Sequence, residues 1–231
     1  IASVNFLKEL RKMLGCDNST GFMQTKWDGA PSVVCGTDPL NGMFFVGTKS
    51  VFAKNSKACY DNVDVDLYYE GDLAEKLKYS LKYFSTLGIQ GIVQGDLLFT
   101  TDVKRETVNG EKLYTFTPNT ITYGIPVDHP IGVATGKAKI GVVFHTHYRG
   151  TDFQTMQAVA GAKVKGSIEV LSVDNDTPMD RVGLNHSEEM LFDKYVANIE
   201  KMCAASGDFL DELTTLSGTA GDAKWHVSSY L

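Results

Sequence analysis

The sequence predicts an antiparallel-rich α+β fold, and three observations indicate it. Short segments rich in β-branched and aromatic residues, separated by glycine and proline, fill much of the chain between residues 22 and 149. Helical periodicity is confined to the start, to one segment near residue 80 and to the end. The 231 residues are 43% hydrophobic and 22% charged, so the chain has enough apolar material to bury a sizeable core.

Two of the expected helices end at a glycine. The first is expected over residues 3–14, where apolar residues recur at helical spacing before Gly15. The second is expected over residues 72–86, with one apolar face and with Gly88 as its stop.

A third helix is expected near the C-terminal end of the sequence. Ser187 is predicted to cap it, and the helix runs from Glu188 to about Ala205. Its apolar residues recur on one face, which we expect to be buried. This stripe consists of Met190, Leu191, Tyr195, Ile199 and Met202.

Short strands are expected early in the chain, at residues 22–26, 32–36 and 43–48. The last two are predicted to form a hairpin, because the sequence DPLNG between them has the residues of a tight turn. Further strands are expected in the segments GIQGIVQGDLLFT, KLYTFTPNTITYGIPV and KAKIGVVFHTHYRG.

Composition excludes several classes of protein. The apolar runs are of strand length, so no segment is expected to span a membrane, and the start lacks the pattern of a signal peptide. Four cysteines without paired spacing indicate free thiols in a reducing compartment, so we expect a cytoplasmic protein. A net charge of −6 disfavours a dedicated binder of duplex nucleic acid.

The segment MQTKWDGAPSVV contains a candidate nucleophile, Lys26. A lysine ammonium reacts as a nucleophile only after its surroundings favour the neutral amine, since its ordinary pKa is about 10.4. Asp28, two residues on, could hold a metal or orient a substrate, and Gly29 lets a ligand approach the backbone. The alternative interpretation is an exposed lysine at a strand end, before an ordinary turn.

This segment resembles motif I of the covalent nucleotidyltransferases, which include ATP-dependent DNA ligases, RNA ligases and mRNA capping enzymes. In that superfamily the lysine attacks the α-phosphate of ATP or GTP, forms a lysyl-nucleotide and releases pyrophosphate. Later segments match further motifs of that superfamily in order. They are Thr48-Lys49-Ser50 for the basic motif, Gly95-Asp96 for the acidic motif, and Tyr123 or Phe144 for the aromatic residue that stacks on the base.

The resemblance implies antiparallel-rich sheets that enclose a nucleotide cleft, an ATP-grasp-like nucleotidyltransferase or ligase domain with flanking helices. It implies ATP and Mg²⁺ as cofactors, with Asp96 and Asp28 as metal ligands, and catalysis by these two residues and Lys26. Gln24 is placed to read the base edge, and we expect Thr25, Gly29 and Lys49 to line the nucleotide site. The acceptor implied is a 5′-phosphate on RNA or DNA.

More narrowly, the sequence is similar to proteins of T4-like bacteriophages, especially those that infect marine cyanobacteria. The similarity covers most of residues 1 to about 155. It implies a fold and a superfamily, and the cytoplasm of an infected cell as the location. It implies no particular acceptor substrate and no oligomeric state.

The sequence also departs from the superfamily pattern. Pro31 stands where ligases have an arginine, and Asp96 is one methylene shorter than the usual glutamate. For the fourth motif, Glu169 is followed by valine instead of glycine. The Lys-x-Lys match at 163–165 precedes that position, so we interpret it as coincidence. These departures favour an alternative function, a catalytically degenerate protein that serves as a structural or interaction module of a phage.

The domain prediction follows from the same motifs. Residues 1–175 are assigned to an adenylation domain that is truncated at its N-terminus, and residues 176–231 to a helical appendix, incomplete at its C-terminus, with the missing motifs beyond it. One further pattern, His145-Thr146-His147, places two imidazoles on one strand. It is interpreted either as a zinc site or as the polar lining of the nucleotide pocket.

Overall fold

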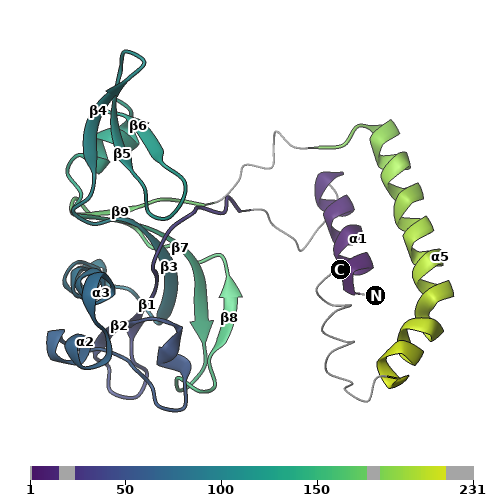
Figure 1. The fold of residues 1–231 in the computed structure, drawn as a ribbon, viewed down its shortest axis with the longest axis horizontal. Coiled ribbons are helices and arrows are strands. Elements are labelled where there is room, and N and C mark those ends of the chain that lie inside the picture. The colour runs from purple at the N-terminus through teal and green to yellow at the C-terminus, as the bar shows by residue number, and fades with distance from the viewer. Residues whose placement is uncertain (1, 16–23, 176–182, 217–231) are drawn as a thin grey trace. The chain divides into compact units, whose positions relative to one another are not determined.

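The protein consists of two units, which are described separately. The computed structural model describes residues 2–15, 24–175 and 183–216 (Figure 1). One unit is Thr25–Asn175, and the other combines Ile1–Gln24 with Asp176–Leu231. The predicted α+β class with antiparallel sheets is confirmed. The domain prediction placed the first helix with the adenylation domain, whereas its contacts group it with the C-terminal helix.

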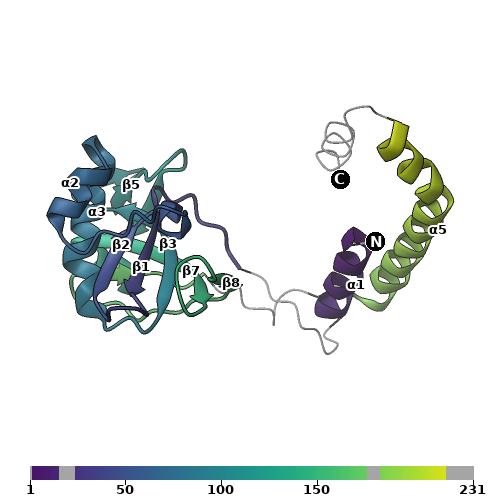
Figure 2. The same cartoon turned by 90° about the horizontal axis from the view of Figure 1, so that it is seen from below.

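The larger unit is built on a six-stranded sheet (Figure 2). Its strands follow the order β2-β1-β3-β7-β8, and each pair of adjacent strands in this order is antiparallel. The short strand β9 pairs in parallel with the start of β7. The strands are β1 (Ser32–Thr37), β2 (Phe44–Gly47), β3 (Ile92–Phe99), β7 (Ile140–Arg149), β8 (Gln157–Ala160) and β9 (Val170–Ser172).

The predicted hairpin of β1 and β2 is confirmed, with Thr37 opposite Phe44. Its turn is fixed by Asp38, whose Oδ1 accepts a hydrogen bond from the Leu40 amide at 2.9 Å. The strand expected at 22–26 is different. Residues 22 and 23 lie outside the described part of the chain, Gln24 forms a single β-bridge, and Thr25 and Lys26 belong to no strand.

A second sheet has three strands, in the order β4-β5-β6. These strands are β4 (Lys104–Val108), β5 (Glu111–Phe116) and β6 (Tyr123–Pro126). Asn109 and Gly110 form the two-residue turn between β4 and β5, and both have positive φ, 51° and 84°. This Asn-Gly pair suits such a hairpin turn because both residue types tolerate that conformation.

Helices cover one face of the larger sheet. The core on that face joins Leu77 and Phe84 of α3 to strand residues such as Val93, Val142 and Phe144. The predicted second helix is confirmed as α3, and Gly88 has the left-handed φ of 63° after it. The helices of this unit are η1 (Lys49–Phe52), α2 (Asn62–Tyr68), α3 (Gly71–Phe84), η2 (Ser85–Leu87) and α4 (Pro130–Thr135).

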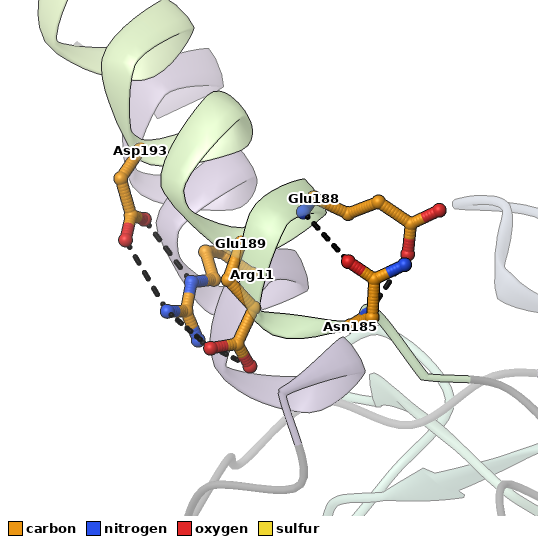
Figure 3. Close-up of polar contacts among 5 residues, drawn as sticks. All are labelled: Arg11, Asn185, Glu188, Glu189 and Asp193. Carbon is orange, nitrogen blue, oxygen red and sulfur yellow. Dashed lines mark hydrogen bonds and ion pairs between the residues drawn. The ribbon is translucent and has the colours of Figure 1, made fainter.

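The other unit pairs α1 (Ala2–Leu14) with α5 (His186–Leu216). Arg11 of α1 joins them, because its guanidinium contacts Asp193 through Nε at 3.1 Å and Nη2 at 3.2 Å (Figure 3). The same guanidinium lies 3.3 Å from Glu189 Oε2. Two parallel N–H···O bonds fix the orientation of the two helices as well as attracting their charges.

Two predictions about the third helix are wrong. Its N-cap is Asn185, whose Oδ1 accepts from the Glu188 amide at 3.1 Å while Glu188 Oε2 accepts from the Asn185 amide at 2.8 Å (Figure 3). This reciprocal pair is a capping box, and it starts the helix before Ser187. The stripe expected to be buried is exposed, with exposed fractions of 58% at Tyr195 and 69% at Met202, because α5 turns Val196 toward α1 instead.

Candidate functional site

The segment that carries Lys26 is anchored on both sides. The Thr25 amide donates to the Asn175 carbonyl at 2.7 Å, and the Asp28 amide donates to the Tyr123 hydroxyl at 2.8 Å. Further on, the Ala30 amide donates to the Leu97 carbonyl at 2.9 Å. These bonds fix the course of the backbone around Lys26, whose side chain is exposed.

The carboxylate of Asp28 is occupied by donors of the β5–β6 loop. Its Oδ1 accepts from Asn119 Nδ2 at 2.9 Å. Its Oδ2 accepts from the Thr120 hydroxyl at 2.7 Å and from the amides of Thr120 and Ile121 at 2.8 and 2.9 Å. These bonds, led by that of the Thr120 hydroxyl, hold the pKa of the Asp28 carboxyl well below its ordinary value. Asp28 thus acts here as a clamp on a loop more than ninety residues away.

Gly29 brings this segment against β3. A Cβ added at Gly29 would lie 2.6 Å from the Cβ of Asp96 and 2.9 Å from the Leu97 carbonyl oxygen. Such distances leave no room for a side chain, so the absence of one is what lets the two backbones meet. The structure thereby brings two of the predicted catalytic segments together, at Gly29 and Asp96.

Asp96 faces an imidazole on the neighbouring strand. His145 Nε2 lies 3.4 Å from Asp96 Oδ1, and about a quarter of each side chain is exposed. His145 is the extra residue of a β-bulge, since Gly95 pairs with Phe144 while Gln94 pairs with Thr146. A bulge of this kind re-aims a side chain, and here it brings the imidazole toward the carboxylate.

A neutral hydrogen-bonded row continues from Asp96 along the same face. Gln94 donates through Nε2 to the Ser32 hydroxyl at 2.7 Å and accepts at Oε1 from the Tyr148 hydroxyl. Ser32 is opposite Asp96 in the register of β1 and β3. Sequence reasoning missed Ser32, Gln94 and Tyr148, and the two-residue spacing of Gln94 and Asp96 on a strand is the one signal that could have indicated a shared face.

The two aromatic candidates for base stacking lie in different places. Tyr123 packs on Trp27 with ring centroids 5.0 Å apart and stacks on Phe116 at 5.6 Å. It therefore supports the segment of Lys26 from the small-sheet side. Phe144 is buried in the helix-covered core against Phe84, with centroids 5.5 Å apart. Its exposed fraction of 2% leaves no face for a base, so its predicted stacking role does not fit this structure.

The remaining predicted residues contribute less to this geometry. Lys49 lies in η1, exposed, and forms no ion pair with the described residues. Gln24 belongs to the unit of α1 and α5, so its role at a base edge stays a prediction. The residues Lys163 and Lys165 line a cavity together with Asn175, whose carbonyl receives the Thr25 amide.

Of the two predicted metal ligands, Asp96 has room for Mg²⁺ and Asp28 has none. Asp28 does not fit, because its two oxygens already accept four hydrogen bonds. Asp96 fits as a single ligand, since its carboxylate is partly exposed and Mg²⁺ on a triphosphate commonly takes only one or two protein carboxylates. Across residues 2–15, 24–175 and 183–216, no group of three or more His, Cys, Asp or Glu side chains is placed to hold a metal by itself. This also leaves the His145 and His147 zinc interpretation without a third ligand in that part of the chain.

The fold and the residues around Lys26 define the protein as an α+β protein in which an anchored lysine segment lies beside β3, the strand that carries Asp96. The chain belongs to the family described as "Family of unknown function (DUF6267)", whose model matches residues 1–231. No curated protein and no solved structure matched the chain. In the described ranges, none of the helices has the length and apolar character needed to cross a membrane.

Proposed function

We propose that the protein is a nucleotidyltransferase that forms a lysyl-AMP intermediate at Lys26 and passes the nucleotide to a nucleic-acid 5′-phosphate. The observation that carries the proposal is the contact of Gly29 with Asp96, which sets the lysine segment against the acidic strand. Phosphoryl transfer is fast only where the nucleophile and the ligand of the charge-neutralising metal are held in one place.

In the proposed reaction, Lys26 loses a proton to solvent and its Nζ attacks the α-phosphorus of ATP. A phosphorus–nitrogen bond forms as the bond to the departing pyrophosphate breaks, in line with the attack. Mg²⁺, when bound to the triphosphate, would neutralise charge, with Asp96 as its protein ligand. In the second step a terminal phosphate oxygen of the acceptor displaces Lys26 and takes the AMP.

Asp28 has a different role in this proposal from the one that the motif implies. Because its oxygens are bonded to residues 119–121, it positions the lysine segment instead of contacting metal. Tyr123 serves the same end through its bond to the Asp28 amide and its packing on Trp27. Base recognition is assigned to the polar side chains of Gln94, Ser32 and Tyr148 on the same face as Asp96, and not to Phe144.

The test is incubation with α-labelled ATP and Mg²⁺, followed by denaturing electrophoresis. A label is expected on the chain, and it should vanish in Lys26→Ala and in Lys26→Arg, because arginine stays protonated. Lys139→Arg changes an exposed lysine just before β7; it is the matched control and should keep the label. An equally strong label on Lys26→Ala would refute the assignment.

The second candidate function is a degenerate relative that serves as a structural or interaction module of a phage. The observation that favours it is the commitment of Asp28 to a loop, which removes one metal ligand that the superfamily resemblance implied. Folded chain that binds ATP without acquiring a covalent label would support this alternative over the enzyme.

A further inference from the structure

A cationic cavity lies on the face of the larger sheet opposite Asp96. Its volume is about 500 Å³, and its lining includes Gly88, Gly91, His147, Arg149, Lys163 and Lys165. His147 is opposite Val93 in the strand register, and Val93 belongs to the helix-covered core. Register partners point to the same face, so His147 and, two residues on, Arg149 lie on the helix-covered side.

The charges of this cavity are of one sign. Of the described residues that line it, none is an aspartate or glutamate. Within the same described ranges, the Arg149 guanidinium and the Lys165 ammonium form no ion pair, and both residues are exposed. The Lys163 ammonium lies 4.0 Å from the carboxylate of Asp174. Gathering Arg149 and Lys165 in a concave site, where neither is paired with an acidic side chain of the described residues, raises the local concentration of anions.

One residue of the cavity lining, His147, has a buried ring nitrogen, Nε2, without a hydrogen-bond partner among the described residues. A buried ring nitrogen without a partner costs free energy unless a ligand or water completes it. Arg149, which lines the same cavity, offers an oxyanion its planar fork of N–H groups.

Another part of the cavity lining does not cancel this charge. It is the turn from Gly88 to Gly91 after α3 and η2, where helix carbonyls would carry partial negative charge. The Ser85 and Thr86 hydroxyls donate to two of these carbonyls, of Lys82 at 3.1 Å and of Tyr83 at 2.7 Å. A Cβ added at Gly88 or Gly91 would meet nothing within 4 Å, so this wall is open to a ligand.

We propose that this cavity, the Arg149 pocket, is a binding site for phosphate oxyanions. Arginine and lysine together form the donor set that phosphate selects over neutral ligands. The phosphate comes either from a free polyphosphate or from the backbone of a single nucleic-acid strand. The inference goes beyond the nucleotidyltransferase proposal and does not depend on Lys26 chemistry.

Two probes distinguish the sources: sodium tripolyphosphate, and a fluorescein-labelled 12-nucleotide single-stranded RNA followed by anisotropy. If the RNA binds and tripolyphosphate displaces it only at high concentration, the natural ligand is a nucleic-acid backbone. If tripolyphosphate binds at least as tightly as the RNA, the natural ligand is a free polyphosphate. In either case the double variant Arg149→Glu, Lys165→Glu should bind that probe with an affinity at least about tenfold lower.

The control is Lys137→Glu with Lys139→Glu, which changes the net charge equally at exposed lysines outside the pocket. It should weaken binding by less than about twofold, as electrostatics at a distance are screened. The milder Arg149→Gln and Lys165→Gln variants, checked for unchanged thermal unfolding, guard against misfolding and should each lower the salt slope for RNA by about one.

Equal weakening in the pocket and control variants, or no binding of either probe, would overturn the inference. The same titrations are made in the Lys26→Ala chain. If the wild-type chain binds a probe in the Arg149 pocket but acquires no label from ATP, the pocket proposal stands and the nucleotidyltransferase proposal fails. If the chain is labelled by ATP but the pocket variants bind as the control does, the pocket proposal fails and the nucleotidyltransferase proposal stands.

Discussion

Thr120 binds Asp28 twice, through its hydroxyl at 2.7 Å and its amide at 2.8 Å, both to the same carboxylate oxygen. The bond joins the lysine segment to the loop between the strands β5 and β6. The Asp28 carboxylate therefore has a structural role, and it affects any chemistry at Lys26 only by positioning the lysine segment.

Asp28→Asn should loosen the 119–121 loop, since an amide replaces an oxygen that accepts several N–H and O–H bonds. Faster amide hydrogen exchange at Thr120 and Ile121 is the expected result. Thr120→Val, which removes only the hydroxyl donor, should have a smaller effect. Unchanged exchange in Asp28→Asn would show that the loop is held by other contacts.

The same carboxylate predicts a dependence on pH. Its pKa is lowered in the folded protein, so its stabilising contribution is present above the unfolded value of roughly 3.9. The contribution is lost as the pH falls further, through the folded pKa. The difference in urea midpoint between the wild type and Asp28→Asn should therefore be full at neutral pH and should shrink only below about pH 4. A difference that vanishes between pH 7 and 5 would contradict this.

Gly29→Ala should separate the lysine segment from β3, because the new Cβ would lie 2.6 Å from the Asp96 Cβ. We expect a loss of roughly 1–3 kcal/mol in the free energy of unfolding, as for overpacking elsewhere. Gly207→Ala in α5 meets nothing within 4 Å and should be neutral or stabilising by up to about 1 kcal/mol. Chemical denaturation measures both, and equal midpoints for the two variants would argue against a close contact at Gly29.

Tyr60→Phe should destabilise the protein, because the Tyr60 hydroxyl donates to Asp38 Oδ2 at 2.6 Å and Asp38 is only 3% exposed. Leaving that carboxylate short of a donor costs about 1–3 kcal/mol. Tyr195→Phe, an exposed tyrosine of α5, is the control and should change the melting temperature little.

Tyr60 also gives the stability an alkaline limit. Burial, and next the bond to Asp38, raise the pKa of Tyr60 to about 12. A raised folded pKa means a contribution that is complete below the unfolded value of roughly 10 and is lost as the pH rises through the folded value. The wild type should lose stability over that interval faster than Tyr60→Phe, as followed by denaturation at stepped pH.

Asn185→Ala should cost about 0.5–2 kcal/mol by removing the cap of α5, whereas Ser187→Ala should cost little. Helical ellipticity during thermal unfolding reports the difference. A larger loss of stability in Ser187→Ala than in Asn185→Ala would show that Ser187 is the N-cap, as the sequence pattern predicted.

Local patterns in the sequence determined the elements whose cause is local. The apolar period of α3 and its glycine stop, the β1–β2 hairpin and the helix α1 follow from side-chain spacing and turn residues within a few positions. The closeness of the Lys26 segment to Asp96 could be anticipated only through motif resemblance, because nothing local joins residues about seventy positions apart.

Tertiary structure alone decided the partners of the site residues. Asp28 meets Thr120, and Phe144 turns to the helix-covered core, since strand alternation fixes a face but not which face is buried. Ser187 and Asn185 are both residue types that cap helices. Asn185 is the N-cap of α5, because it forms two reciprocal hydrogen bonds with Glu188. The stripe of α5 is exposed because α1 packs on a neighbouring face, a choice that depends on Arg11 and Asp193 from opposite ends of the chain.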